Sequence, residues 1–329
     1  MKKTVEKSYN FEIIVPCYNE ETMLPELLET LDEISNQLEA RYNIHIYYLF
    51  IDDGSTDGTL PFLRGKASQS ERMKYLSFSR NFGKEAAIYA GIQYTKGDYV
   101  CLIDADMQDP CELMFQMIPC VLNKEADCAA ARRITRKGEP ILRSFLARCF
   151  YRVMSKISGI QMADGIRDYR VMNRAYIDAI LQMGEYNRFS KGIFEWIGFR
   201  TKWFEYENIE RKAGNSKWSI WKLFLYSIDG ITAFSSAPLL LSSILGVIFS
   251  FISIFALLMI LIRTLVWGDP VSGWPSLICV ITFFGGIQLL CIGFLGQYLS
   301  RTYIESKHRP IYIVREHNIQ NDEKEINTL

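Results

Sequence analysis

Short apolar runs alternate with polar loops and amphipathic stretches through the first half of the chain. Four of the runs predict buried strands, at residues 11–15, 46–51, 75–78 and 99–103. Apolar residues at three-to-four spacing predict one helix over 24–34, and another helix is predicted over 85–94. This repetition of strand, loop and helix predicts an α/β fold with a mostly parallel sheet and helices on both of its faces.

A polar cluster follows each predicted strand. Pro16 is expected to end the first strand, and the turn signal 52–59 follows the second. Asp104 and Asp106 follow the fourth strand, one residue apart. Their side chains point the same way in an extended segment, so they predict a hard oxygen site for Mg²⁺ or Mn²⁺ and a substrate diphosphate. A solvated acidic loop is the alternative, but ligands of such sheets bind beyond the carboxyl ends of the strands, which favours a nucleotide site.

The last third of the chain is far more apolar. Serines are the only polar side chains in 238–262, and a second apolar run covers 277–299. Each run is about long enough to cross a ~30 Å hydrocarbon layer, and two in tandem favour membrane spans over buried core helices. Basic residues flank the pair on both sides: Arg211, Lys212, Lys217 and Lys222 before it, and Arg301, Lys307, Arg309 and Arg315 after it. This excess of basic residues on the flanks predicts an integral membrane protein. The domain before the spans and both termini are expected in the cytoplasm, and the short connector 264–276 outside.

Composition narrows the choice of partners. Lys plus Arg and Asp plus Glu both number 37, which gives no case for a nucleic-acid partner. Eight cysteines without Cys-x-x-Cys spacing and only three histidines argue against zinc. Residues 143–158 and 218–226 combine apolar or aromatic side chains with basic ones, which predicts helices at the membrane surface. For 143–158, an ordinary surface helix packed on the core is the alternative.

Seven motifs occur in an order that resembles a known family. VPCYNE (15–20), DDGSTDG (52–58), RNFGK (80–84) and DADMQDP (104–110) resemble family 2 glycosyltransferases of the GT-A fold, which is Rossmann-like. DYR (168–170), RKAGNSKW (211–218) and the tail from GQY (296–298) to RPIY (309–312) resemble polyprenyl-phosphate glycosyltransferases, relatives of dolichol-phosphate mannose synthase. The resemblance covers about residues 11–314.

The resemblance implies roles for individual residues. It implies a set that binds the nucleotide sugar: Pro16, Tyr18, Glu20, Asp52, Asp53, Lys84, Asp104, Ala105, Arg132, Arg211 and Lys217. Asp104, Asp106 and Gln108 would hold the metal. Arg211 and Lys217 match the family's phosphate-binding cations. The planar guanidinium of Arg and the compact ammonium of Lys both suit phosphate oxygens. Asp168 matches the candidate base, although we expect it mainly to position the acceptor phosphate with Arg170. Arg167 departs from the family pattern and could add a cation there.

These implied roles predict a metal-dependent inverting glycosyltransferase. The expected reaction moves one sugar, glucose from UDP-glucose as first choice, to polyprenyl (undecaprenyl) phosphate. A GDP-mannose-using mannosyltransferase, a processive polysaccharide synthase and a non-enzymatic scaffold or sensor are the alternatives, although the chain lacks the Gln-x-x-Arg-Trp motif of the synthases.

The same reading predicts how the chain is divided. We expect a GT-A domain over 1–215, an interfacial helix over 216–235, two transmembrane helices over 236–300 and a cytoplasmic tail over 301–329. Glycines in both apolar runs are compatible with a homo-oligomer.

Overall fold

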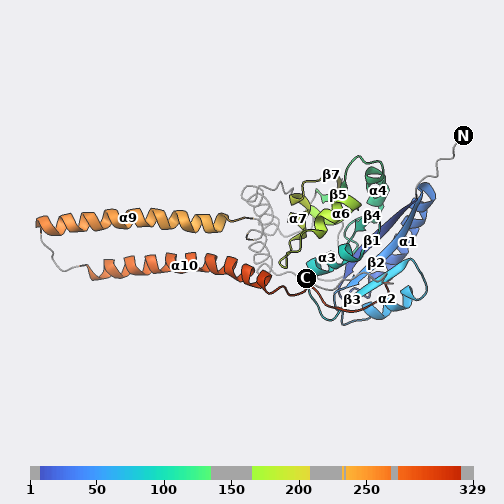
Figure 1. The fold of residues 1–329 in the computed structure, drawn as a ribbon, viewed down its shortest axis with the longest axis horizontal. Helices are drawn as coiled ribbons and strands as arrows, with labels where there is room; N and C mark the ends of the chain where they lie inside the picture. The colour runs from blue at the N-terminus through green and yellow to red at the C-terminus, as the bar shows by residue number, and fades with distance from the viewer. Residues whose placement is uncertain (1–7, 135–164, 208–231, 233–234, 268–272, 320–329) are drawn as a thin grey trace. The chain divides into compact units, whose positions relative to one another are not determined.

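The chain forms two compact units. A computed structural model describes residues 8–134, 165–207, 232, 235–267 and 273–319. The first unit, which we call the sheet unit, comprises Met1–Ser227 and Arg309–Leu329, and the second, the hairpin unit, comprises Ile228–His308 (Figure 1). The predicted interfacial segments 143–158 and 218–226 lie outside the described residues.

The described part of the sheet unit contains one eight-stranded sheet in the order β7-β5-β6-β4-β1-β2-β3-β8. The strands are β1 (Tyr9–Cys17), β2 (Ile44–Asp52), β3 (Met73–Phe78), β4 (Tyr99–Leu102), β5 (Cys128–Arg133), β6 (Ile166–Asn173), β7 (Thr201–Tyr206) and β8 (Val314–His317). β6 runs antiparallel to β4 and β5, and β8 runs antiparallel to β3, while the other neighbours are parallel. The predicted mostly parallel sheet and its first four strands are confirmed.

Pro16 lies inside β1, so the prediction that it ends the strand is wrong. It is in register with Ile51 of β2. On the other side of β1, the ladder to β4 ends at the pair of Ile14 and Leu102. The Ile14 carbonyl faces that side, because it accepts a hydrogen bond from the Ile103 N–H at 3.0 Å. Pro16 is two residues further along, so its missing N–H faces a side where the ladder has ended.

Helices cover both faces of the sheet, as the alternating pattern predicts (Figure 1). They are α1 (Leu24–Arg41), α2 (Thr59–Ala67), α3 (Lys84–Tyr94), α4 (Met114–Leu122, after a 3₁₀ turn at Cys111–Leu113), α6 (Arg174–Leu181) and α7 (Ser190–Trp196). Helices α1, α2 and α4 enclose the main apolar core with the β1 side chains of Phe11 and Ile13. On the opposite face, α3 packs so closely on β1 that a Cβ at Gly91 would lie 2.3 Å from the Ile14 side chain.

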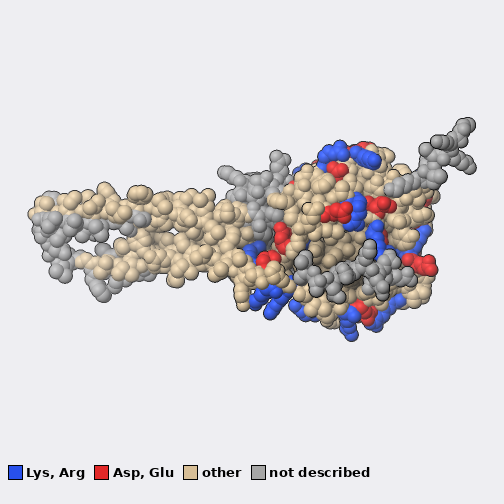
Figure 2. Space-filling model, in the orientation of Figure 1, with Lys and Arg blue, Asp and Glu red and all other residues tan. Residues whose placement is uncertain are grey.

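The hairpin unit consists of two long helices that lie side by side, α9 (Ala237–Trp267) and α10 (Trp274–Ser306) (Figure 1). Phe249 meets Phe284 edge-on at 5.5 Å, and the Tyr298 hydroxyl donates to the Ser235 carbonyl at 2.6 Å. Over most of the visible length of the hairpin the surface carries no Lys, Arg, Asp or Glu (Figure 2). Among the described residues, the segment Phe283–Ser306 is the one long and apolar enough to cross a membrane, and Ala237–Phe249 is a shorter apolar segment. The crossing by α9 therefore stays a prediction.

Candidate active site

The loops after β1 and β2 are joined by hydrogen bonds. The Asn19 N–H donates to the Ser55 hydroxyl at 2.9 Å, and the Asn19 side-chain oxygen accepts from the Thr56 N–H at 2.8 Å. The Glu20 N–H donates to the Thr59 hydroxyl at 3.0 Å. Asn19 takes up a positive φ of 54°, which Asn tolerates better than most residues. These bonds make one continuous rim at the carboxyl ends of the two strands.

Two adjacent acids at the end of β2 fix the loops around them. Asp52 is fully buried, and it accepts from the Ser55 N–H at 3.0 Å and from the Ser77 hydroxyl at 2.7 Å. Asp53 is also buried, and it accepts from the N–H groups of Phe82 at 2.6 Å and of Gly83 at 2.9 Å. Burial raises the pKa of Asp53 to about 6, against the lowering effect of these two hydrogen bonds.

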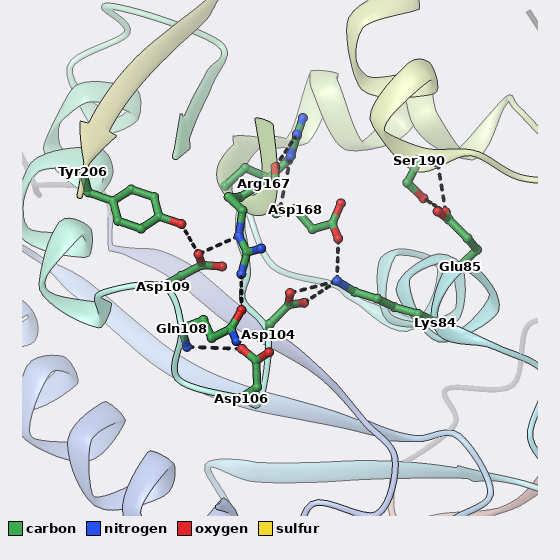
Figure 3. Close-up of polar contacts among 11 residues, drawn as sticks. Lys84, Glu85, Asp104, Asp106, Gln108, Asp109, Arg167, Asp168, Ser190 and Tyr206 are labelled. Carbon is green, nitrogen blue, oxygen red and sulfur yellow. Dashed lines mark hydrogen bonds and ion pairs between the residues drawn. The ribbon is translucent and has the colours of Figure 1, made fainter. Parts of the chain in front are cut away.

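One lysine contacts two carboxylates, one that follows β4 and one that lies within β6. The Lys84 ammonium, on the first residue of α3, lies 2.7 Å from Asp104 Oδ1 and 2.5 Å from Asp168 Oδ2 (Figure 3). The Lys84 side chain is 45% exposed, whereas those of Asp104 and Asp168 are 15% and 9% exposed. The motifs around 84, 104 and 168 thus meet at one point near the surface.

The two carboxylates differ in their electrostatics. Burial disfavours the charge on Asp168, but the positive charges of Lys84 and Lys191 outweigh it and hold the Asp168 pKa below its usual range. For Asp104, burial prevails over the attraction of Lys84 and raises the pKa. Asp168 is therefore the firmly ionised member of the pair, which makes it a weak proton acceptor.

A second ion pair lies beside this cluster. Arg167 donates from Nε to Asp109 Oδ1 at 2.8 Å and from Nη2 to Gln108 Oε1 at 3.4 Å (Figure 3). The Tyr206 hydroxyl also donates to Asp109. The Gln108 N–H donates to Asp106 Oδ1 at 3.2 Å. Arg167 thus ties the end of the acidic loop to β6, and in this arrangement its guanidinium serves Asp109 and Gln108 rather than an acceptor phosphate.

Comparison with known proteins decides the family. The sequence profile of Glycosyl transferase family 2 matches residues 12–181. The bactoprenol glucosyl transferase of Shigella phage SfV is 40% identical over 306 residues, which are 92% of this chain and 97% of that protein. The chain belongs to glycosyl transferase family 2. It is a glycosyltransferase.

A second sequence relative agrees with this assignment. The prophage bactoprenol glucosyl transferase homolog of Escherichia coli (strain K12) is 38% identical to this glycosyltransferase over 92% of its chain and 97% of the relative. Glucosyl-3-phosphoglycerate synthase from Mycobacterium tuberculosis, crystallised with Mn²⁺, UDP and glucosyl-3-phosphoglycerate, is more distant. It shares 15% identity over 68% of this chain and 78% of that chain, with a TM-score of 0.46. The family assignment therefore rests on the sequence relatives.

The remaining predicted donor-binding residues of the glycosyltransferase lie at different depths. Tyr18 is exposed on the rim and Glu20 is half-buried, whereas Pro16 and Ala105 are buried. Arg132, at the end of β5, lies 3.6 Å from Glu205. Arg211 and Lys217 lie outside the described residues. The donor-binding roles of all these residues stay predictions.

Three predicted contacts have little room for a ligand in this structure. Asp52 offers no exposed surface to a nucleotide base, and Asp53 offers almost none. Arg170 is fully buried: it donates to the carbonyls of Asp168 and Arg167 at 3.3 and 3.2 Å, and its guanidinium lies 3.6 Å over the Phe194 ring. We infer that the three side chains hold the site together. Of the predicted catalytic pair, Asp168 contacts the half-exposed Lys84, whereas Arg170 is fully buried.

One contact at the site was not predicted. Glu85 accepts from the Ser190 N–H at 2.9 Å and from the Ser190 hydroxyl, which joins the first turn of α3 to α7 (Figure 3). Burial raises the pKa of Glu85, and the charge of Asp168 adds to the effect. The sequence signal for this contact was an acid directly after the predicted site residue Lys84.

The oxygen atoms of this site fit a divalent ion in kind. Among the described residues, no three His, Cys, Asp or Glu side chains gather as a metal site would need. Mg²⁺, however, is usually bound by one or two carboxylates together with water and substrate phosphates. Asp104 and Asp106 are two such carboxylates, and the side-chain oxygen of Gln108, the third predicted ligand, accepts a hydrogen bond from Arg167 in this structure. The ion and the Lys84 ammonium would compete for the oxygens of Asp104, which lie 2.7 and 2.8 Å from Nζ.

Proposed function

We propose that this glycosyltransferase moves one glucose from UDP-glucose to a polyprenyl phosphate at the cytoplasmic face of a membrane, with inversion at the anomeric carbon. The observation that carries the proposal is the meeting of Asp104 and Asp168 at Lys84. It brings the predicted donor site and the predicted acceptor site to one point. The relatives named bactoprenol glucosyl transferase support both the sugar and the lipid.

The proposed reaction is a single displacement. An oxygen of the polyprenyl phosphate attacks the anomeric carbon of glucose, the bond from that carbon to the donor diphosphate breaks, and UDP leaves with the electron pair. A phosphate monoester loses its second proton near ~6, so the acceptor is already a strong nucleophile at neutral pH. Asp168, with its lowered pKa, would orient the acceptor and Lys84 rather than remove a proton.

Charge on the leaving diphosphate must be neutralised. Asp104 and Asp106 would hold a Mg²⁺ or Mn²⁺ ion that stabilises this charge. Lys84 lies within reach of the same position, and Arg211 and Lys217 are predicted to add positive charge from the adjoining segment. With the Asp104 oxygens holding such an ion, the Lys84 ammonium would be left to Asp168 and the acceptor phosphate.

The test uses the full-length protein in liposomes that contain undecaprenyl phosphate. Radiolabelled UDP-glucose is added with Mg²⁺ or Mn²⁺, and label is counted in the organic-extractable lipid. We expect one hexose per lipid by mass spectrometry, equal release of UDP, and loss of transfer with a chelator. GDP-mannose run in parallel tests the mannosyltransferase alternative. Label in a polymer would identify a processive synthase, and UDP release without a lipid product would disprove the proposed acceptor.

Asp106→Ala serves as the variant control in this assay. We expect it to lose transfer by at least ~10²-fold, because the diphosphate loses part of its electrostatic clamp. Asp106 is half-buried in a loop and absent from the apolar core, so the variant should unfold at the temperature of the wild type. Turnover equal to the wild type would remove Asp106 from the proposed metal site.

A further inference from the structure

The chain returns to the sheet unit after the hairpin and adds the edge strand β8 to β3. β8 pairs antiparallel with β3, with Val314 opposite Phe78 and His317 opposite Leu76. Residues from Arg309 onward belong to the same compact unit as the site. Two segments far apart in sequence, before and after the long helices, therefore form one continuous sheet.

The residues just before β8 hold the end of β3 where the site loop begins. The Ser79 N–H donates to the Ile313 carbonyl at 2.9 Å. The Tyr312 ring stacks on Phe78 with centroids 4.8 Å apart and planes at 17°. The Tyr312 hydroxyl donates to Gln93 Oε1 at 2.7 Å, so the same side chain contacts both β3 and α3. Tyr312 thus connects the two elements between which the loop 79–83 runs.

That loop places Lys84. Phe82 packs edge-on against Phe78 at 5.8 Å, and the N–H groups of Phe82 and Gly83 donate to Asp53. Gly83 has a φ of 99°, and α3 begins at the next residue, whose ammonium contacts the site carboxylates. The loop is therefore held from two sides, by Asp53 within the sheet and by the tail at its edge.

We propose that Tyr312 is a positioning residue for Lys84. Residues 312–318, which we call the tail strap, support the site loop 79–83 at their Tyr312 end, whereas their Asn318 end only attaches the segment to the beginning of β3. Loss of the Tyr312 ring would free Phe78 and Phe82 to move, and the backbone of the loop would follow. A displacement of about 1 Å at a catalytic side chain can cost ~10²-fold in rate. The measurement of kcat rests on the proposed function, whereas the structural part of the proposal does not.

The strap offers a matched control at its far end. Asn318 accepts from the Tyr75 N–H at 2.7 Å and donates to the Met73 carbonyl at 3.0 Å. These bonds attach the strap near the beginning of β3, away from the loop. Asn318→Ala should therefore weaken the attachment of β8 without releasing Phe78 or Ser79. Tyr312→Phe keeps the stacking on Phe78 and removes only the bond to Gln93.

The experiment compares Tyr312→Ala, Tyr312→Phe and Asn318→Ala in the full-length protein. We expect Tyr312→Ala to lower kcat by ~10-fold or more with little change in KM for the donor, and Tyr312→Phe to recover most of the rate. Asn318→Ala should lower the melting temperature while kcat stays near the wild-type value. A wild-type kcat in Tyr312→Ala, or equal losses of kcat in Tyr312→Ala and Asn318→Ala, would overturn the proposal.

Hydrogen exchange gives a readout independent of turnover. The amides of Phe82 and Gly83 should exchange faster in Tyr312→Ala than in Asn318→Ala, because the first variant releases the loop and the second does not. Equal protection in the two variants would count against the strap. If wild-type protein transfers no sugar, the proposed function fails, whereas the exchange measurement still tests the strap.

Discussion

At the scale of single residues, the surroundings of Asp168 separate two mechanisms. The carboxylate lies 2.5 Å from the Lys84 ammonium, and its pKa is lowered by Lys84 and Lys191 in spite of burial. A base of such low pKa would contribute little to a reaction at neutral pH. The acceptor phosphate also has little need of one, because it is mostly a dianion above its second pKa near ~6.

We therefore expect Asp168→Asn to keep measurable transfer. Its rate should rise with pH as the acceptor loses its second proton near ~6 and level off above that value. Asn preserves the size of the side chain and one acceptor oxygen for Lys84. The measurement is a pH–rate profile of wild type and variant with saturating donor and metal. No detectable transfer at pH 8, with normal donor and acceptor binding, would instead make Asp168 an obligatory base.

Asp53 predicts a change of stability with pH. Burial raises its pKa from 3.8 to about 6 in the folded protein. Between these values the folded state holds a proton that the unfolded chain has released, so this group's contribution to stability falls as pH rises through the range. Asn keeps an oxygen for the N–H groups of Phe82 and Gly83 but does not titrate.

Asp53→Asn should thus gain stability relative to the wild type as pH rises from 4 to 7. Melting temperatures of both proteins at several pH values give the difference, in which the titrations of all other groups cancel. Melting curves that differ by the same amount at every pH would show that Asp53 titrates near its ordinary value.

At the scale of elements, the sequence predicts those strands whose own residues are apolar. β1 to β4 contain runs of Ile, Leu, Val, Tyr and Phe, and all four were predicted. β5 is Cys128–Arg133, with three alanines and two arginines, and β8 is the polar segment Val314–His317. These segments form strands because they pair with neighbouring strands, β5 with β6 and β7 and β8 with β3, and no local pattern reveals that pairing.

The site residues also divide into those that the sequence predicts and those that depend on the packing of the sheet. Asp104 and the loop that leads to Lys84 were predicted from the strand pattern, because parallel strands bring the loops at their carboxyl ends together. Asp168 was predicted only from the resemblance to the family, because it lies near the start of the antiparallel strand β6. The burial of Arg170 and the pairing of Arg167 with Asp109 were not predicted, because both depend on the antiparallel insertion of β6 beside β4. From the sequence alone, a charged side chain on a strand such as β6 is expected to face solvent or a ligand, and only the packing shows that it is buried.

The position of β8 leads to a prediction for a soluble form. A chain that ends at Phe234 lacks β8 and leaves β3 as an unpaired edge, which favours aggregation. The same chain joined by a flexible linker to residues 309–319 should regain this strand. We expect the joined form to melt several degrees higher, since ~1 kcal/mol shifts the melting temperature of a domain of this size by about 2–4 °C. Both forms are compared by thermal melting and light scattering.

The linker design has a simple control. Replacing Tyr312 and Val314 by Gly in the joined tail keeps its length but removes its apolar contacts. This control should behave like the form that ends at Phe234. If all three forms melt at one temperature and stay monomeric, β8 adds nothing to the stability of the sheet unit.

At the scale of the whole molecule, the hairpin unit exposes many apolar side chains. Phe251 of α9 and Leu289 of α10 are 70% and 71% exposed, and they belong to a long series of exposed apolar side chains. Water-soluble proteins rarely expose apolar patches of this extent. At ~1.5 Å per residue, each helix is longer than the ~30 Å hydrocarbon layer. We therefore retain the prediction that both helices cross the membrane.

Whether both helices cross the membrane or only one does can be tested at three positions of the chain. Single cysteines at Glu207, Gly273 and Lys307 mark the chain before α9, between the helices and after α10. If both helices cross, a membrane-impermeant maleimide should label Gly273→Cys in intact cells and label Glu207→Cys and Lys307→Cys only after permeabilisation. If the sheet unit is cytoplasmic and α10 alone crosses, only Lys307→Cys should be labelled in intact cells. Protection of all three would place the hairpin on the cytoplasmic side. All variants are made in a protein from which the other reactive cysteines have been removed.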